Sequence, residues 1–205
     1  MKYNFPRPRP GQTVGLLGGS FDPAHIGHAN ITYAALRRFG LDHVWWLVSP
    51  GNPLKDTGPA AIDQRLKHAK KIMQHPKVTV TDVEHTLGTR YTAETISRLQ
   101  ILYPNVKFVW LMGADNLLQL HYWQDWKKIM RKVPVGIIAR PGYGAKARGS
   151  KAAQVFRNER LPSWKSWSLG RSKAPKWCFI NLPLSHISST EIRARGEWEN
   201  KTKRT

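Results

Sequence analysis

Residues 19–28 read GSFDPAHIGH and come directly after the apolar run VGLLG at 14–18. A short apolar run that ends in glycines and leads into a helical pattern is typical of a buried strand followed by a helix. We expect this helix from about Gly27 to Phe39, with Gly40 as its stop. At Gly18 and Gly19 a side chain would block the approach of a ligand to the backbone. Because a helix N-terminus presents unpaired N–H groups, the stretch predicts an anion site.

His25 and His28 lie three residues apart, so they share one face of the first helical turn and point toward the same anion. Each ring offers a donor, and a bound polyphosphate would favour the protonated form. Such a pair is also compatible with a structural role or with half of a metal site, but no third ligand follows at a usual zinc spacing. The chain has neither a P-loop nor a G-x-G-x-x-G after a strand, so a different kind of phosphate site is needed.

Six apolar, β-branched or aromatic runs alternate with helical patterns along the chain. This alternation predicts an α/β fold with a Rossmann-like open, mostly parallel sheet and helices on both faces. The predicted strands are VGLLG, HVWWLVS, KVTVTDV, VKFVWLMG, VPVGIIA and KWCFINL, and further helices are expected at about 60–74, 92–102, 115–120 and 125–131. We expect a single domain over 1–205, with a basic excursion from the sheet at about 141–176.

The 205 residues include 33 Lys and Arg against 13 Asp and Glu, a formal charge of +20 that must attract anions. Much of this excess lies at 140–176, where Trp164 and Trp167 are interleaved with basic residues. A solvated basic loop is the preferred interpretation; a wall beside a phosphate-rich ligand and a nucleic-acid surface are the alternatives. The single cysteine, Cys178, and the lack of a leader or an apolar span predict a soluble, cytoplasmic protein.

The residues at 19–28 resemble the signature G-x-F-D-P-x-H-x-G-H of the HxGH nucleotidyltransferase superfamily. Residues 187–193, ISSTEIR, match the second motif of that superfamily, I-S-[SA]-T-x-I-R. Class I aminoacyl-tRNA synthetases share the HIGH motif, but this chain is too short and has no KMSKS-like stretch. His25 argues against the phosphopantetheine adenylyltransferases, which usually have Thr there. The resemblance implies that a second helix N-terminus holds the phosphates of ATP, although Ser188 and Glu191 also fit a plain helix cap.

Further stretches are similar to the bacterial nicotinate mononucleotide adenylyltransferases. They are SPGNPLK at 49–55, RYTAET at 90–95, MGADNL at 112–117, residues 123–129 and RPGY at 140–143. The resemblance implies ATP-binding residues Gly18, Gly19, Ser20, Phe21, Gly27, Gly113, Asp115, Ile187, Ser188, Ser189 and Arg193, and nicotinate mononucleotide-binding residues Lys55, Tyr91, Thr92, Trp123 and Arg140. As alternatives, Asp115 is a helix cap and Trp123 and Trp126 are core residues.

The implied reaction transfers AMP from ATP to nicotinate mononucleotide, with His25, His28 and Arg193 as catalytic residues and Mg²⁺ bound with ATP rather than by a protein cluster. The expected partners are ATP and the mononucleotide; a homo-oligomer is compatible with the sequence, and neither a membrane nor nucleic acid is expected. The rivals are another adenylyl- or cytidylyltransferase, a basic nucleic-acid-binding protein and a metal-dependent hydrolase. Leu54 departs from the His of many relatives, and the chain ends twelve residues after Arg193.

Overall fold

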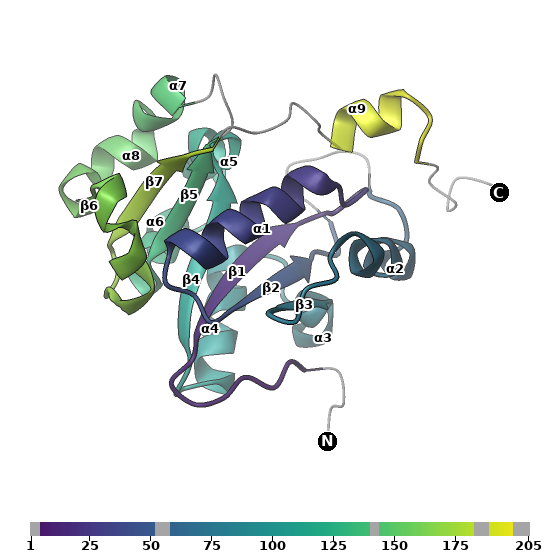
Figure 1. The fold of residues 1–205 in the computed structure, drawn as a ribbon, viewed down its shortest axis with the longest axis horizontal. Coiled ribbons are helices and arrows are strands. Elements are labelled where there is room, and N and C mark those ends of the chain that lie inside the picture. The colour runs from purple at the N-terminus through teal and green to yellow at the C-terminus, as the bar shows by residue number, and fades with distance from the viewer. Residues whose placement is uncertain (1–4, 52–57, 140–143, 183–188, 199–205) are drawn as a thin grey trace.

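A computed structural model of the chain describes residues 5–51, 58–139, 144–182 and 189–198. Its centre is a seven-stranded sheet in the order β3-β2-β1-β4-β5-β7-β6, with parallel pairing throughout (Figure 1). The strands are β1 Thr13–Gly19, β2 His43–Val48, β3 Val78–Thr81, β4 Lys107–Gly113, β5 Val135–Ala139, β6 Arg160–Leu161 and β7 Trp177–Asn181. The six predicted strands are confirmed. The two-residue β6 was not predicted, because so short a strand leaves no hydrophobic pattern.

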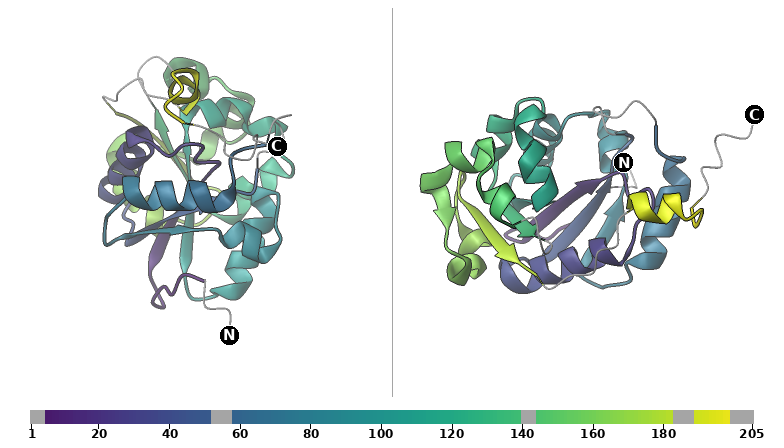
Figure 2. Two further views of the ribbon diagram at one scale, coloured as in Figure 1. Left: turned by 90° about the vertical axis from the view of Figure 1, so that its right-hand side faces the viewer. Right: turned by 90° about the horizontal axis from the view of Figure 1, so that it is seen from above.

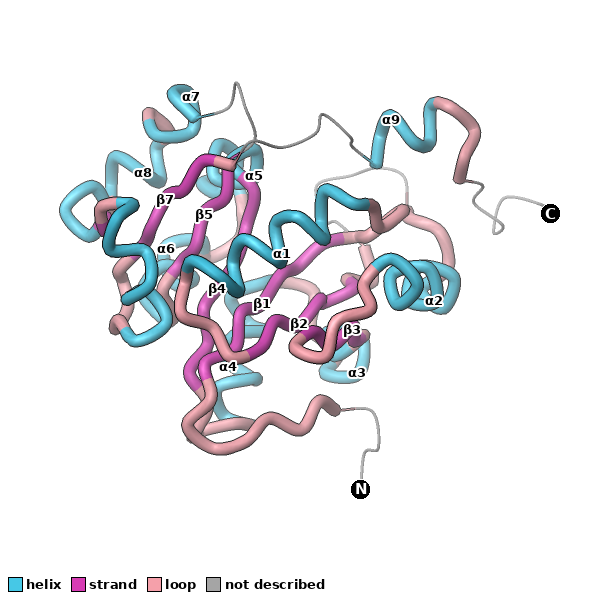
Figure 3. Tube along the Cα trace, viewed as in Figure 1, coloured by secondary structure: helices cyan, strands magenta, loops and turns pink. Residues whose placement is uncertain are grey.

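Helices connect the strands, as the tube drawing in Figure 3 shows. The α-helices are α1 Ile26–Arg38, α2 Ile62–Ile72, α3 Val83–Leu87, α4 Thr92–Leu102, α5 Ala114–Gln119, α6 Trp126–Lys132, α7 Gly144–Arg148, α8 Lys151–Val155 and α9 Ser189–Ala194; the 3₁₀ helices are η1 Leu120–Tyr122, η2 Arg157–Glu159 and η3 Ser163–Arg171. The helix predicted at 92–102 has those bounds. The predicted stop after α1 is also confirmed, since Gly40 has a φ of 63°.

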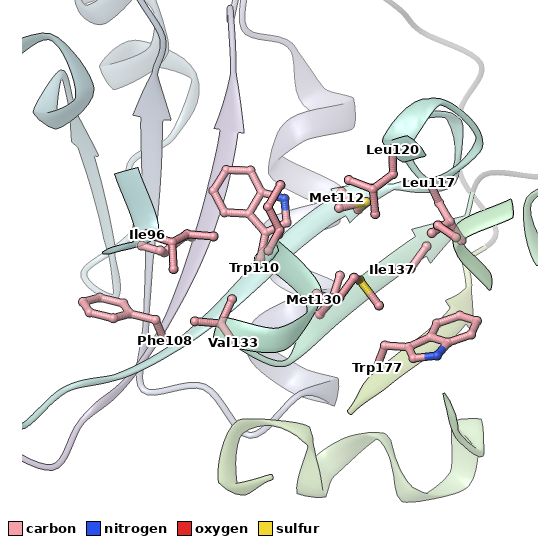
Figure 4. Close-up of a cluster of buried hydrophobic side chains, with 14 of the residues drawn as sticks. Ile96, Phe108, Trp110, Met112, Leu117, Leu120, Met130, Val133, Ile137 and Trp177 are labelled. Carbon is pink, nitrogen blue, oxygen red and sulfur yellow. The ribbon is translucent and has the colours of Figure 1, made fainter. Parts of the chain in front are cut away.

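Helices cover both faces of the sheet, which confirms the predicted fold class (Figure 2). Along β4 the buried side chains alternate: Trp110 and Met112 join one core cluster, whereas Val109 and Leu111 join the other. The first cluster packs under α4, α5 and α6, and Figure 4 shows part of it. The second packs under α1 and α2. The two helical layers therefore lie on opposite sides of β1 and β4.

The basic segment is folded, so the prediction of a solvated loop is wrong for its described part, 144–176. α7 and α8 bury Ala147, Ala152 and Ala153, and β6 extends the sheet beyond β7. η3 closes over the C-terminal end of α1, where the Gly170 N–H donates to the carbonyl of Phe39 at 2.9 Å. Each element has too few residues to show a helical period in the sequence. The tryptophans Trp164 and Trp167 remain exposed, at 71% and 60%.

Candidate active site at the carboxyl ends of β1 and β4

The connection from β1 to α1 is shaped by Phe21, a non-glycine residue with a φ of 47°. Such a backbone costs on the order of 1 kcal/mol or more, so the surroundings must hold it in place. The Phe21 ring is 1% exposed, stacks on Trp46 at 4.8 Å between centroids and packs against His28 at 4.7 Å. The side chain of Phe21 therefore belongs to the core. Only its backbone remains for the predicted contact with phosphate.

His25 and His28 cap the N-terminus of α1 reciprocally. His25 is the N-cap residue, and its Nδ1 accepts the Gly27 N–H at 3.0 Å. His28 Nδ1 accepts the backbone N–H of His25 at 3.3 Å, and the two ring centroids are 4.1 Å apart. This is the arrangement of a capping box, with imidazoles in place of the usual hydroxyl and carboxylate.

The cap determines which ring nitrogen carries the proton. Because Nδ1 of each ring accepts a hydrogen bond, a neutral ring must hold its proton on Nε2. With Nδ1 engaged in the cap, Nε2 is the ring atom from which each histidine can donate. The backbone of His28 is held in addition by Thr32, whose hydroxyl donates to the His28 carbonyl at 2.9 Å.

The neighbouring strands β1 and β4 end in glycines, Gly19 and Gly113, and this part of the carboxyl edge of the sheet is called the glycine edge. A Cβ on Gly18 would lie 2.5 Å from the Trp110 ring, so packing against Trp110 explains this glycine without a ligand. A Cβ on Gly19 would make only ordinary contact with Phe21, at 3.4 Å. Leu17 pairs with Leu111, two residues before Gly19 and Gly113, so these glycines end neighbouring strands. The strand order reverses between β1 and β4, where open α/β sheets bind their ligands.

Asp115 lies in the first turn of α5 and is exposed. Gly113 is the N-cap residue of α5, so the alternative interpretation of Asp115 as a helix cap is wrong. Asp115 Oδ1 lies close to the place that a Cβ on Gly113 would take, so a side chain at 113 would displace this exposed carboxylate. The carboxylate is thus free of a capping role at the edge of the sheet.

Three of the residues expected to bind the mononucleotide, Tyr91, Thr92 and Trp123, lie on the other face of the sheet from the histidines. Tyr91 is the N-cap residue of α4 and makes no side-chain cap, and Thr92 is the first helical residue. Trp123 lies between η1 and α6, partly buried against the core cluster under α4. Trp126 packs edge-to-face on Phe156 at 6.0 Å between centroids, as a core residue would. A ligand that reaches both faces must cross the glycine edge between β1 and β4.

The second motif packs against the first. The Ser189 hydroxyl donates to the Pro23 carbonyl at 2.9 Å, and Arg193 Nη1 donates to the Asp22 carbonyl. The same Nη1 is 4.0 Å from Asp22 Oδ2. Segments 166 residues apart are thereby joined, and α9 lies beside the N-terminal end of α1 (Figure 1). The predicted site residues Lys55, Arg140, Ile187 and Ser188 lie outside the described residues.

Arg65, which carries no functional signal in the sequence, bonds to the loop at residues 20–25 that joins β1 to α1, here called the phosphate loop. It is 1% exposed, and its guanidinium donates to three backbone carbonyls within 2.7 Å: Ala60, Ser20 and Ser49. Burial lowers the pKa of Arg65, and Asp22 partly offsets this change. Arg65 fixes the carboxyl ends of β1 and β2 relative to α2. Its position in a polar, basic helix gave no sign of burial.

Glu84 is a buried carboxyl group behind the start of α4. Its Oε1 accepts the Thr95 hydroxyl at 3.2 Å, and the Thr95 oxygen lies 2.9 Å from that of Thr89. Burial raises the pKa of Glu84 from its usual 4.5 to about 7, against the smaller opposing effect of Thr95. Between pH 4.5 and about 7, the Glu84 carboxyl group is therefore protonated in the folded chain but ionised in the unfolded chain.

The stability contributed by Glu84 is therefore fully present at acidic pH and falls as the pH rises through about 7. We expect Glu84→Gln, which cannot ionise, to gain about 3 kcal/mol relative to the parent between pH 4.5 and 8. Urea unfolding at both pH values measures this change. Glu94→Gln, which removes an exposed carboxylate of α4, is the control and should shift by less than about 0.5 kcal/mol. A difference between Glu84→Gln and the parent that does not change with pH would contradict the raised pKa.

Comparison with known proteins identifies the family. Residues 16–195 match the family model described as cytidylyltransferase-like. A probable nicotinate-nucleotide adenylyltransferase of Roseobacter denitrificans is 59% identical over 97% of this chain and 100% of its own length. A protein of the same name from Cereibacter sphaeroides is 60% identical over 90% of this chain and 98% of its own length. The relatives therefore span nearly the whole chain.

Solved structures share the fold. The nicotinic acid mononucleotide adenylyltransferase of Plasmodium falciparum, complexed with NaAD, aligns with a TM-score of 0.67 at 20% identity and covers 89% of this chain and 83% of that one. A putative nicotinate-nucleotide adenylyltransferase of Vibrio parahaemolyticus aligns with a TM-score of 0.51 at 17% identity, covering 93% and 92%. At these identities the likeness concerns the fold alone.

Proposed function

The chain belongs to the nicotinate-nucleotide adenylyltransferases, within the cytidylyltransferase-like family, and we propose how its residues transfer AMP from ATP to nicotinate mononucleotide. The products are nicotinate adenine dinucleotide, an intermediate of NAD biosynthesis, and pyrophosphate. The observation that carries the proposal is the reciprocal cap of His25 and His28, which holds both imidazole rings at the N-terminus of α1, directly after the carboxyl end of β1. The mononucleotide phosphate is already an anion at neutral pH, so positioning and charge neutralisation supply most of the catalysis.

In this proposal the mononucleotide phosphate attacks the α-phosphorus of ATP in line, and the bond to pyrophosphate breaks without a covalent enzyme intermediate. His28 Nε2–H donates to the α-phosphate oxygens in the transition state, and His25 donates to a neighbouring phosphate. The backbone of Ser20 and Phe21 lines the same cradle. Arg193, at the end of the second motif, meets the leaving pyrophosphate together with Ser189.

We propose that Mg²⁺ binds at this edge together with ATP. Among the described residues no group of three His, Cys, Asp or Glu could hold a metal ion. Asp22 Oδ1 accepts the Ala60 N–H at 3.3 Å and the Trp198 indole N–H at 2.7 Å, so this carboxylate already has a structural role. We propose that phosphate oxygens and water complete the magnesium shell. An ion held in this way would supply positive charge against the phosphates.

The acceptor is proposed to lie across the glycine edge, under α4. The N–H groups of Tyr91 and Thr92 would bind its carboxylate, Trp123 would stack on its pyridine ring, and Asp115 would accept bonds from a ribose of the adenylyl group. Lys55 and Arg140 stay predictions for its phosphate.

We propose that residues 1–205 act as one domain. Within the residues that the structure describes, no helix is both long and apolar enough to span a bilayer. The buried Cys178 agrees with a cytoplasmic location, which stays a prediction.

The choice of acceptor tests this function. We expect a preference for nicotinate over nicotinamide mononucleotide of about a hundredfold or more in kcat/KM, because backbone donors satisfy a carboxylate but meet the NH₂ of a carboxamide with a second donor. Trp123→Ala should weaken both acceptors together and keep their ratio, because stacking does not distinguish the two groups. Steady-state pyrophosphate release with each mononucleotide at fixed ATP measures both effects. Equal kcat/KM values would reject nicotinate as the acceptor and favour another transferase of this fold.

A further inference from the structure

The C-terminal segment, residues 189–198, has little apolar attachment to the rest of the protein. Its helix, α9, has six residues and no buried side chain. A helix this short is not stable by itself, so contacts with other elements must hold it. Yet α9 carries Arg193, the residue proposed to meet the leaving pyrophosphate. What fixes this segment therefore decides how well Arg193 is placed.

Trp198 supplies such an attachment after the turn at Gly196. Its indole Nε1–H donates to Asp22 Oδ1 at 2.7 Å, a hydrogen bond strengthened by the carboxylate charge. Its ring lies against His68 of α2, with 4.8 Å between the centroids. His68 in turn bonds through Nε2 to the carbonyl of Ala24, at 3.0 Å. Trp198 thus contacts α2 through His68 and the phosphate loop through Asp22. His68 also links Trp198 to Ala24 of the same loop.

Asp22 connects Trp198 to Arg193. Oδ1 of Asp22 accepts Trp198 and the Ala60 N–H, so the carboxylate orientation is fixed from two sides. Oδ2 is then 4.0 Å from Arg193 Nη1, and the carbonyl of Asp22 accepts the same guanidinium. Loss of the indole N–H would release one of the two bonds that set this carboxylate. Loss of the ring would also release residues 194–198, which follow Arg193.

We propose that Trp198 is a positioning residue that latches residues 189–198 onto the phosphate loop and thereby holds Arg193 in place for ATP. The inference rests on the proposed function, because that function gives Arg193 its role. A latched segment binds the phosphates without the entropy loss of ordering a free one. Trp198 acts through Asp22 and Arg193 and does not itself touch the substrate.

Two variants separate the parts of the latch. We expect Trp198→Ala to raise the KM for ATP about tenfold, while kcat stays within about twofold because saturating ATP orders the segment. Trp198→Phe keeps a ring against His68 but loses the N–H donor, so its KM should rise about threefold. The KM for nicotinate mononucleotide should stay within about twofold in both variants, since that site lies across the sheet edge.

The matched control is Trp164→Ala. Trp164 is 71% exposed on η3, which packs at the opposite end of α1 from the histidines. This variant should keep the parent values of both KM constants. Trp198 belongs to neither core cluster, so the melting temperature of Trp198→Ala should stay within about 2 °C of the parent.

Limited trypsin digestion measures how firmly residues 189–198 are attached, independently of catalysis. Cleavage after Arg195, which is exposed, should become about tenfold faster in Trp198→Ala and stay unchanged in Trp164→Ala. Unchanged cleavage, or faster cleavage with an unchanged or lower KM for ATP, would overturn the proposal. If the parent releases no pyrophosphate with any mononucleotide, the proposed function is rejected and so is the role of Trp198 toward ATP, while the digestion still shows whether Trp198 anchors the segment.

Discussion

Replacement of His28 by Asn should lower kcat by about a hundredfold or more and leave the fold intact. The Asn amide oxygen can take the place of Nδ1 and accept the His25 N–H, so the cap on α1 persists. The variant lacks the Nε2–H that is proposed to meet the α-phosphate. Because that contact strengthens in the transition state, the loss should appear in kcat more than in the KM for ATP.

His28→Ala serves as the comparison. Both variants lose the ring that packs against Phe21, but His28→Ala also removes the cap acceptor, so it should be about 1 kcal/mol or more less stable than His28→Asn. Steady-state kinetics and thermal unfolding of both variants separate the two effects. A kcat near the parent value in a folded His28→Asn would remove His28 from the proposed role.

Arg65→Met should destabilise the fold by about 3 kcal/mol or more. The substitution keeps an apolar stem but leaves the carbonyls of Ser20, Ser49 and Ala60 without their buried donor. Since Ser20 begins the proposed phosphate cradle, the KM for ATP should rise as well. Arg65→Lys keeps the charge but cannot reach all three carbonyls with one fixed fork, so it should fall between the parent and Arg65→Met.

The control for Arg65 is Arg98→Met on α4. Arg98 is an exposed arginine paired with Glu94 at 3.0 Å, and its loss should cost less than about 1 kcal/mol. Urea unfolding at pH 7 measures all three free energies. Equal losses for Arg65→Met and Arg98→Met would show that the buried carbonyls find other partners.

The parts of the fold whose pattern extends over many residues could be predicted from the sequence. The apolar runs identified six strands, and Gly40 marked the end of α1 because only glycine adopts its φ without strain. The pairing of two motifs 166 residues apart, seen in the contact of Ser189 with Pro23, followed from the resemblance. The two resemblance motifs and the strand pattern predict the same site, at the carboxyl ends of the parallel strands.

Other features depend on three-dimensional contacts that no local pattern encodes. Gly18 was predicted from the approach of a ligand, and the structure adds a packing reason for this glycine, because a Cβ there would meet the ring of Trp110, 92 residues later in the chain. The direction of the His25 and His28 rings became apparent only from the cap. Arg65 has the side chain of a typical surface helix residue, and its burial depends on carbonyls from three segments. Trp198 lies beyond the last motif, where its pairing with Asp22 has no local signal.

The fate of the α-phosphorus tests the central claim most directly. Parent enzyme is incubated with Mg²⁺, nicotinate mononucleotide and ATP labelled at the α-phosphate, and the label is followed into products and protein. Direct in-line transfer predicts that all transferred label appears in nicotinate adenine dinucleotide, with unlabelled pyrophosphate in equal amount and none on the protein. Label released as AMP or ADP without dinucleotide, or retained on the protein, would contradict direct transfer between the two nucleotides.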